Sequence, residues 1–172
     1  KNVIKTINNS LNEKQFNSHL LHGVTGSGKT EIFIEAIKTV IKKNKTAILL
    51  LPEISLTPQI AGRFKSVFPG KVALWHSQLT KTQRNSTWEK IYNGECNIVI
   101  GARSAIFTPL KNIGLIIIDE EQSFGVEQKE QLKKNQPNVH ILTMSATPIP
   151  RTLQSSLFKL RDISLIKTPP VN

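Results

Sequence analysis

The sequence predicts an α/β domain with a parallel β-sheet flanked by helices. Two observations predict this fold class. Short apolar runs alternate with longer amphipathic stretches, as strands do when helical crossovers join them. Several runs are also β-branched and apolar on both faces, which is typical of strands buried inside a parallel sheet. The runs lie at 19–21, 47–51, 72–75, 97–100, 115–119 and 139–144.

Helices are expected in the stretches between the apolar runs. In the first of these stretches, Phe33, Ile37, Val40 and Ile41 recur at the spacing of an apolar helical stripe. The helices are expected at 30–43, 57–67, 81–93 and 126–134.

Composition restricts the class of protein. The 172 residues are 38% hydrophobic and 20% charged, which suits one compact domain and argues against wholesale disorder. The single cysteine excludes a disulfide within the chain and favours a reducing compartment, so we expect a cytoplasmic location. No apolar run approaches the ~20 residues of a membrane span, so no membrane partner is expected. The formal charge of +11 favours a polyanionic partner such as nucleic acid, with a coding bias toward lysine as an equal alternative.

Polar clusters directly follow five of the apolar runs. In an open α/β sheet, ligands bind beyond the carboxyl ends of the strands, so these clusters predict one functional edge. They are GVTGSGKT (23–30), PEISLTPQ (52–59), GARSAIF (101–107), DEEQ (119–122) and SATPIPRT (145–152).

The first cluster fits the phosphate-loop pattern G-x-x-x-x-G-K-[ST] in full. Glycines let backbone N–H groups curl around phosphate oxygens, the lysine brings a charge to the β and γ phosphates, and the threonine hydroxyl can reach Mg²⁺. A glycine-rich turn without a ligand is the alternative. The cluster predicts ATP and Mg²⁺ as cofactors, held by Gly23, Thr25, Gly26, Ser27, Gly28, Lys29 and Thr30.

The acidic cluster predicts the rest of the phosphate chemistry. Asp119 is expected to hold Mg²⁺ together with Thr30, and Glu120 to orient or deprotonate the attacking water. Lys29, Asp119 and Glu120 are thus the catalytic candidates. An acidic helix N-terminus is the alternative, and it would not require a phosphate loop upstream. Hydroxyl and amide groups nearby are expected to couple this cluster to other sites: Gln122, Ser145 and Thr147.

With these motifs, the chain resembles the first RecA-like motor domain of superfamily-two DNA helicases and translocases. The five clusters look like helicase motifs I, Ia, Ib, II and III, and LNEKQ places Gln15 where family members read adenine. Residues 11–121 look most like the PriA family of primosomal helicases. Residues 122–170 look more like the RecG family or transcription-repair coupling factor (Mfd).

The resemblance implies a RecA-like P-loop NTPase fold and an ATP-dependent DNA helicase that acts in replication restart, recombination or repair. It implies single-stranded, forked or duplex DNA as partner, and replication-restart proteins or RNA polymerase as further partners. By position, it assigns DNA contacts to Thr57, Gln59, Arg103 and Ser104. Short hydroxyls, an amide and an arginine suit sequence-independent phosphate contacts.

The resemblance also predicts the domain organisation. Residues 1–10 are an N-terminal extension, 11–168 the ATP-binding domain, and 169–172 the start of a linker to a second RecA-like domain. In such motors ATP lies between two domains, and the second supplies arginine fingers. Because an arginine finger contributes about 10³–10⁵ in rate in related systems, we expect residues 1–172 alone to bind nucleotide weakly and hydrolyse it poorly.

Three alternatives stay open. The first is a RecG-like or Mfd-like translocase in place of a PriA-like helicase. The second is a P-loop kinase or GTPase, although the sequence lacks a guanine-reading motif such as N-K-x-D. The third is a non-catalytic DNA-binding module with a residual nucleotide site, against which the intact Lys29, Thr30, Asp119 and Glu120 argue.

Overall fold

The computed structural model describes the predicted sheet and three of its helices. The described residues are Lys5, Asn9, 18–22, 28–52, 55–119, 139–145 and 162–165, with the backbone alone at 18–22, 145 and 162–165. The helix expected at 126–134 lies outside them.

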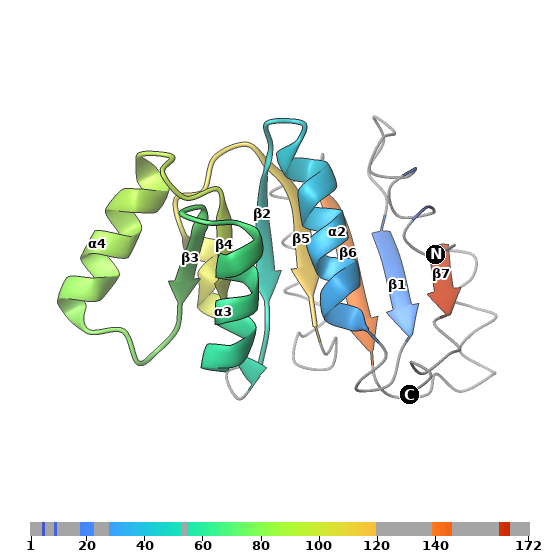
Figure 1. The fold of residues 1–172 in the computed structure, drawn as a ribbon, viewed down its shortest axis with the longest axis horizontal. Coiled ribbons are helices and arrows are strands. Elements are labelled where there is room, and N and C mark those ends of the chain that lie inside the picture. Colours follow the sequence, from blue (N-terminus) through green and yellow to red (C-terminus); the bar gives the residue numbers. More distant parts are fainter. Residues whose placement is uncertain are drawn as a thin grey trace.

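The sheet formed by these residues has seven strands, all parallel, in the order β3-β4-β2-β5-β6-β1-β7 (Figure 1). Six strands coincide with the six predicted apolar runs to within two residues, which confirms the α/β fold class. The strands are β1 (Ser18–His22), β2 (Thr46–Leu50), β3 (Val72–Trp75), β4 (Ile98–Gly101), β5 (Ile113–Ile118), β6 (His140–Ser145) and β7 (Asp162–Leu165).

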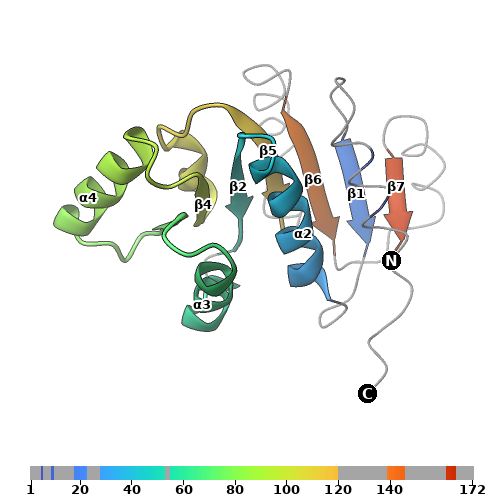
Figure 2. The same ribbon diagram turned by 45° about the horizontal axis from the view of Figure 1, so that its top comes forward.

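Strand β7 has no counterpart among the predicted strands. Its sequence, Asp-Ile-Ser-Leu, alternates polar and apolar residues over only four positions, so no apolar run marks it. Among the described strands it pairs with β1 alone and forms one edge of their sheet (Figure 2), while β3 forms the other (Figure 1). Pairing with β1 across a long sequence separation therefore determines this strand.

Three α-helices begin and end close to the predicted positions. They are α2 (Lys29–Ile41), α3 (Pro58–Val67) and α4 (Lys81–Tyr92). Thr57 caps α3, since its hydroxyl accepts a hydrogen bond from the Ile60 amide at 3.3 Å. Thr80 caps α4 in a reciprocal capping box with Gln83. A short 3₁₀ helix, η2 (Arg103–Phe107), was not predicted.

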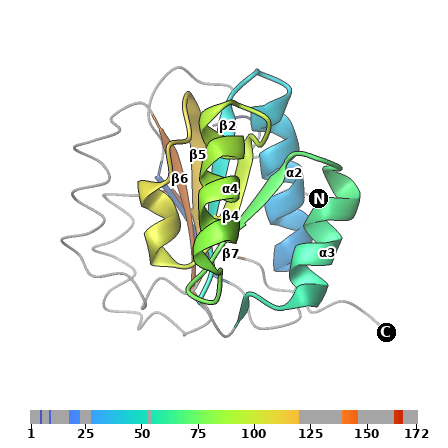
Figure 3. The same ribbon diagram turned by 90° about the vertical axis from the view of Figure 1, so that its left-hand side faces the viewer.

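Helices cover both faces of the sheet, as the side view shows (Figure 3). Along β2, Ala47 and Leu49 belong to the core beneath α2 and α3, whereas Ile48 and Leu50 belong to the core on the opposite face. That second core includes Ile91 of α4 and contacts from η2. Alternate side chains of a strand point to opposite faces of the sheet. An apolar run that is buried on both faces therefore packs against a layer of helices on each side.

The strand order explains why the polar clusters gather at one edge. The five strands that precede the clusters are consecutive in the sheet, in the order β4-β2-β5-β6-β1. All are parallel, so their carboxyl ends share one edge. Neighbouring strands lie about 4.8 Å apart, so the five ends span roughly 20 Å.

No helix in the described part of the chain is long and apolar enough to span a membrane.

Candidate functional site

Gly28 ends the predicted phosphate loop and caps α2. Its backbone is left-handed, with φ 81° and ψ 21°, a region that glycine enters at no steric cost. The Gly28 carbonyl accepts hydrogen bonds from the amides of Glu31 at 3.1 Å and Ile32 at 3.4 Å. A side chain here would strain the turn that brings the helix N-terminus, with its unpaired N–H groups, to the edge of the sheet.

Lys29 and Asp119 face one another across this edge. Lys29 begins α2, and Asp119 follows β5, where its amide donates to the Leu50 carbonyl at 2.9 Å. The Lys29 Nζ lies 4.0 Å from the Asp119 Oδ1, and the side chains are only 13% and 18% exposed. A separation of 4.0 Å is too long for a direct hydrogen bond between these two atoms, but the two charges still attract one another across it.

A pocket of about 340 Å³ opens at this pair. Its polar end contains Gly28, Lys29, Thr30 and Asp119. A hydroxyl and a carboxylate are oxygen ligands of the kind Mg²⁺ takes, and an ammonium and a helix N-terminus attract phosphate, so this donor set fits a phosphate-bound Mg²⁺. The remaining lining comes from α2, β2, the segment after β2, and α3: Glu31, Phe33, Leu49, Leu51, Ser55, Ile60, Arg63 and Phe64.

A larger hollow of about 720 Å³ lies elsewhere, between α3, β3 and α4. None of the predicted site residues lines it. We take the smaller pocket as the candidate site, because its lining includes predicted phosphate and Mg²⁺ ligands and the lining of the larger hollow does not.

Arg63 is a pocket residue that the sequence did not predict. From α3, its guanidinium donates a hydrogen bond to the Glu31 carboxylate in the first turn of α2, and both side chains are about half exposed. Arg63 also lines a second hollow of about 520 Å³, which extends from Thr30 to Gln59. No pattern in the sequence links Glu31 to Arg63, because their contact depends on how the two helices pack on the sheet.

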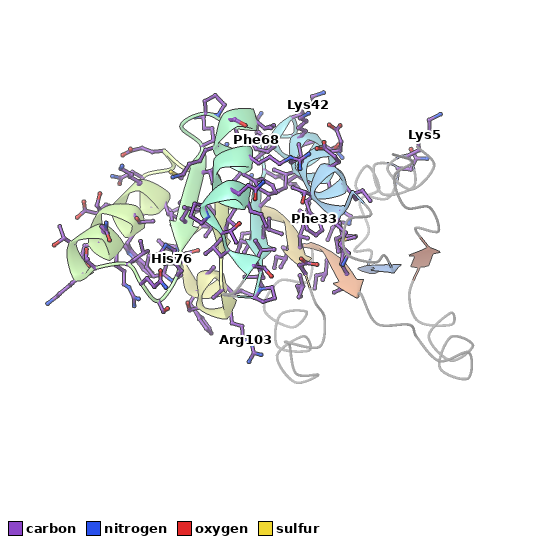
Figure 4. All side chains as sticks on the ribbon, turned by 60° about the horizontal axis from the view of Figure 1, so that its bottom comes forward. Lys5, Phe33, Lys42, Phe68, His76 and Arg103 are labelled. Atoms are coloured by element: carbon purple, nitrogen blue, oxygen red, sulfur yellow. The ribbon has the colours of Figure 1, made fainter. Side chains whose placement is uncertain are left out.

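The four predicted DNA-contact residues follow β2 and β4, which are neighbours in the sheet. Thr57 and Gln59 begin α3, Arg103 and Ser104 begin η2, and all four are exposed. Figure 4 shows Arg103 extending away from the ribbon, with Lys42 at the far side of the sheet. Thr57 uses a lone pair as the helix cap, and its O–H can still donate to a phosphate oxygen.

For the remaining predicted site residues, the structure describes either the backbone alone or nothing. The backbone of Ser145 ends β6, next to β5, and its side chain is outside the description. The others lie wholly outside the described residues: Gln15, Gly23, Thr25, Gly26, Ser27, Glu120, Gln122 and Thr147.

Known proteins are similar in sequence to this chain. Replication restart protein PriA of Bacillus subtilis (strain 168) is 46% identical over 139 residues, which cover 81% of this chain and 17% of that protein. The PriA of Helicobacter pylori (strain ATCC 700392 / 26695) is 42% identical over 164 residues, 95% of this chain and 26% of that protein. This chain thus spans about a fifth of the length of these relatives.

Solved structures give the same fold. The structure of RecG bound to a three-way DNA junction superposes with a TM-score of 0.79 at 29% identity, over 99% of this chain and 24% of that one. A DEAD box protein from Methanococcus jannaschii superposes with a TM-score of 0.68 at 24% identity, over 95% of this chain and 47% of that one. The predicted RecA-like fold and the resemblance to superfamily-two helicases of the PriA and RecG group are confirmed.

A family model described as "DEAD/DEAH box helicase" matches residues 2–156. This range includes the phosphate loop, the acidic cluster and every predicted DNA-contact residue. The chain belongs to the DEAD/DEAH box helicase family.

Proposed function

We propose that residues 11–168 form the ATP-binding motor domain of a PriA-like, ATP-dependent DNA helicase that acts in replication restart, recombination or repair. The observation that carries the proposal is the Lys29–Asp119 pair, 4.0 Å apart at the end of a helix that Gly28 caps. The PriA relatives, at 42–46% identity, support the choice of activity.

The nucleotide is ATP with Mg²⁺, which supplies charge stabilisation for phosphoryl transfer when bound. Lys29 attracts the β and γ phosphates, while Thr30 and Asp119 provide oxygen ligands for the cation. The loop glycines Gly23 and Gly26, with Thr25 and Ser27, surround the phosphates with backbone N–H groups. Gln15 reads the adenine, and Glu120 orients or deprotonates the attacking water.

The motor acts on DNA through the segments that follow β2 and β4. Thr57, Gln59, Arg103 and Ser104 contact phosphates and read no sequence. Gln122, Ser145 and Thr147 couple the acidic cluster to these contacts. The overall charge of +11 supports a polyanionic partner.

A second RecA-like domain completes the nucleotide site, and residues 169–172 lead to it. Replication-restart proteins are the expected partners of a PriA-like motor, and RNA polymerase of an Mfd-like one. A cytoplasmic location fits the single, buried thiol of Cys96.

A RecG-like or Mfd-like translocase is the second candidate. The superposition on RecG with a TM-score of 0.79 favours it, since that structure holds a three-way DNA junction. A preference for forked DNA would favour a PriA-like or RecG-like motor, whereas translocation on duplex DNA with displacement of RNA polymerase would favour an Mfd-like one.

The test is ATP hydrolysis by the full-length protein that carries this chain, with single-stranded, forked and duplex DNA. We expect DNA to stimulate hydrolysis and Lys29→Ala to abolish it. Lys42→Ala is the matched control, because Lys42 is an exposed lysine at the other end of the same helix.

A fully active Lys29→Ala variant would refute the phosphate-loop assignment. DNA binding without any ATP hydrolysis by the wild type would instead favour a non-catalytic DNA-binding module. Nucleotide turnover that ignores DNA would favour a kinase or GTPase.

A further inference from the structure

The 3₁₀ helix η2 has an inner and an outer face. In a 3₁₀ helix, residues three apart lie above one another. Ala105 lies in the core and forms the inner face, and Thr108, the residue that directly follows η2, is buried on the same side. Ser104 and Phe107 form the outer face, where Ser104 is exposed and Phe107 is 78% exposed. An aromatic ring and a hydroxyl therefore project together from the carboxyl edge of the sheet.

Hydrogen bonds to neighbouring backbone hold η2 in this orientation. The Ala102 amide donates to the Trp75 carbonyl at 3.2 Å, which ties the start of η2 to the end of β3. The Thr108 amide and hydroxyl both donate to the Ala105 carbonyl, at 3.2 Å and 2.7 Å. Because β3 anchors the start of η2 and Ala105 and Thr108 are buried on its inner side, η2 holds the Phe107 ring on the outer side.

Phe107 differs from the other exposed aromatic residues in the described part of the chain. The ring of Tyr92, which is 56% exposed, lies 4.3 Å from the Lys111 Nζ. Trp88 packs against Trp75 with ring centroids 5.8 Å apart. Phe107 has no such ring partner among the described residues. Its ring leaves apolar area in water that a flat, apolar ligand would cover.

We propose that Phe107 stacks on an unpaired nucleobase of single-stranded DNA, next to phosphates that Arg103 and Ser104 contact. The inference rests on the proposed function and specifies how that motor engages DNA. Three residues of a 3₁₀ helix advance about 6 Å, so a single nucleotide can reach both the Ser104 hydroxyl and the Phe107 ring.

Stacking specifies the class of DNA. In a duplex the faces of the bases are covered by their neighbours, so the Phe107 ring can stack only on a base that is unpaired and turned outward. Every base has a π-face, so the contact tolerates any sequence. Phosphate contacts alone would not distinguish single-stranded from duplex DNA in this way.

The test measures binding of fluorescein-labelled DNA to the full-length protein by anisotropy. Two oligonucleotides of equal length are used, one of thymidines and one with abasic sites. On oligothymidine we expect Phe107→Ala to weaken binding about 5- to 150-fold, and Phe107→Tyr to retain wild-type affinity. On the abasic oligonucleotide, which offers no base to stack, Phe107→Ala and wild type should bind equally.

Tyr92→Ala is the matched control, because Tyr92 is an exposed aromatic residue at the end of α4 and should not affect either oligonucleotide. An equal loss on both oligonucleotides would show that Phe107 supports the loop, and the inference would be wrong. Unchanged binding with reduced DNA-stimulated ATP hydrolysis would indicate a protein contact at Phe107 and would also overturn it.

Failure of this inference differs from failure of the proposed function. If the wild type shows DNA-stimulated ATP hydrolysis and Phe107→Ala matches it in every assay, only the stacking contact is wrong. If the wild type neither binds DNA nor hydrolyses ATP in response to it, the proposed function fails and the inference falls with it.

Discussion

Arg63 in α3 and Glu31 in the first turn of α2 form an ion pair beside the pocket that contains Lys29 and Asp119. The pair joins the helix that follows the phosphate loop to the helix that Thr57 caps. Both side chains are more than half exposed, so water and salt screen the interaction.

We expect Arg63→Gln to lower the free energy of unfolding by no more than about 1 kcal/mol, because exposed ion pairs contribute about 0.2–1 kcal/mol. Urea unfolding of Arg63→Gln, Glu31→Gln and the double variant gives the coupling energy directly. The coupling should vanish at about 1 M salt. A coupling energy well above about 1 kcal/mol that does not change with salt would contradict an exposed, solvent-screened ion pair.

Asp119→Asn tests the proposed cation site separately from the lysine. Removing the carboxylate charge should abolish most of the gain in ATP affinity that Mg²⁺ provides, and should lower turnover about 100-fold or more. ATP titrations with Mg²⁺ and with EDTA check this in wild type and variant. Glu31→Gln removes a nearby exposed carboxylate and should retain the Mg²⁺ effect. If Mg²⁺ raises the ATP affinity of Asp119→Asn as much as that of the wild type, Asp119 is not a ligand of the cation.

Two glycines give opposite predictions for stability. A Cβ at Gly101 would overlap the Trp75 carbonyl oxygen and lie 2.9 Å from the Ala105 Cβ. Because β3 and η2 are fixed there, we expect Gly101→Ala to destabilise the fold by about 1–3 kcal/mol. Gly62 lies inside α3, with nothing within 4 Å of a Cβ, so Gly62→Ala should stabilise by about 0.5–1 kcal/mol. A urea midpoint of Gly101→Ala that does not fall would contradict the packing of β3 and η2 against Gly101, and a midpoint of Gly62→Ala that does not rise would contradict the open environment at Gly62.

Cys96 gives a pH-dependent prediction. Burial raises the pKa of the Cys96 thiol, because the thiolate is poorly solvated in the core. The folded state then holds its proton to higher pH than the unfolded state does. This contribution to stability is fully present below the unfolded pKa of about 8.5 and is lost as pH rises through the folded pKa. The stability of the wild type relative to Cys96→Ala should therefore fall above about pH 8.5 in urea unfolding. A flat difference up to pH 10 would argue against a buried, protonated thiol.

Much of the fold follows from local sequence, because six strands are apolar runs and Thr57 and Thr80 mark helix starts by their capping chemistry. Other features depend on distant parts of the chain. β7 is a strand because β1 pairs with it, and η2 is too short for a periodic signal. At the candidate site, the phosphate-loop pattern predicted Gly28 and Lys29 and the acidic cluster predicted Asp119, and the structure places all three around one pocket. Arg63 lines the same pocket and Phe107 is exposed on η2, and neither has a sequence signal, because helix packing and exposure set their environments.

The position of β1 has a consequence for the order of folding. Among the strands that the structure describes, β1 is synthesised first, yet its partners are β6 and β7, with Ser18 opposite Ile141. Strands β2 to β5 can pair with one another as they leave the ribosome, whereas β1 must wait for a partner synthesised far later. The strand that precedes the phosphate loop is thus synthesised early but joins the sheet late. Until then, the unpaired backbone groups of β1 are open to mispairing and to chaperone binding.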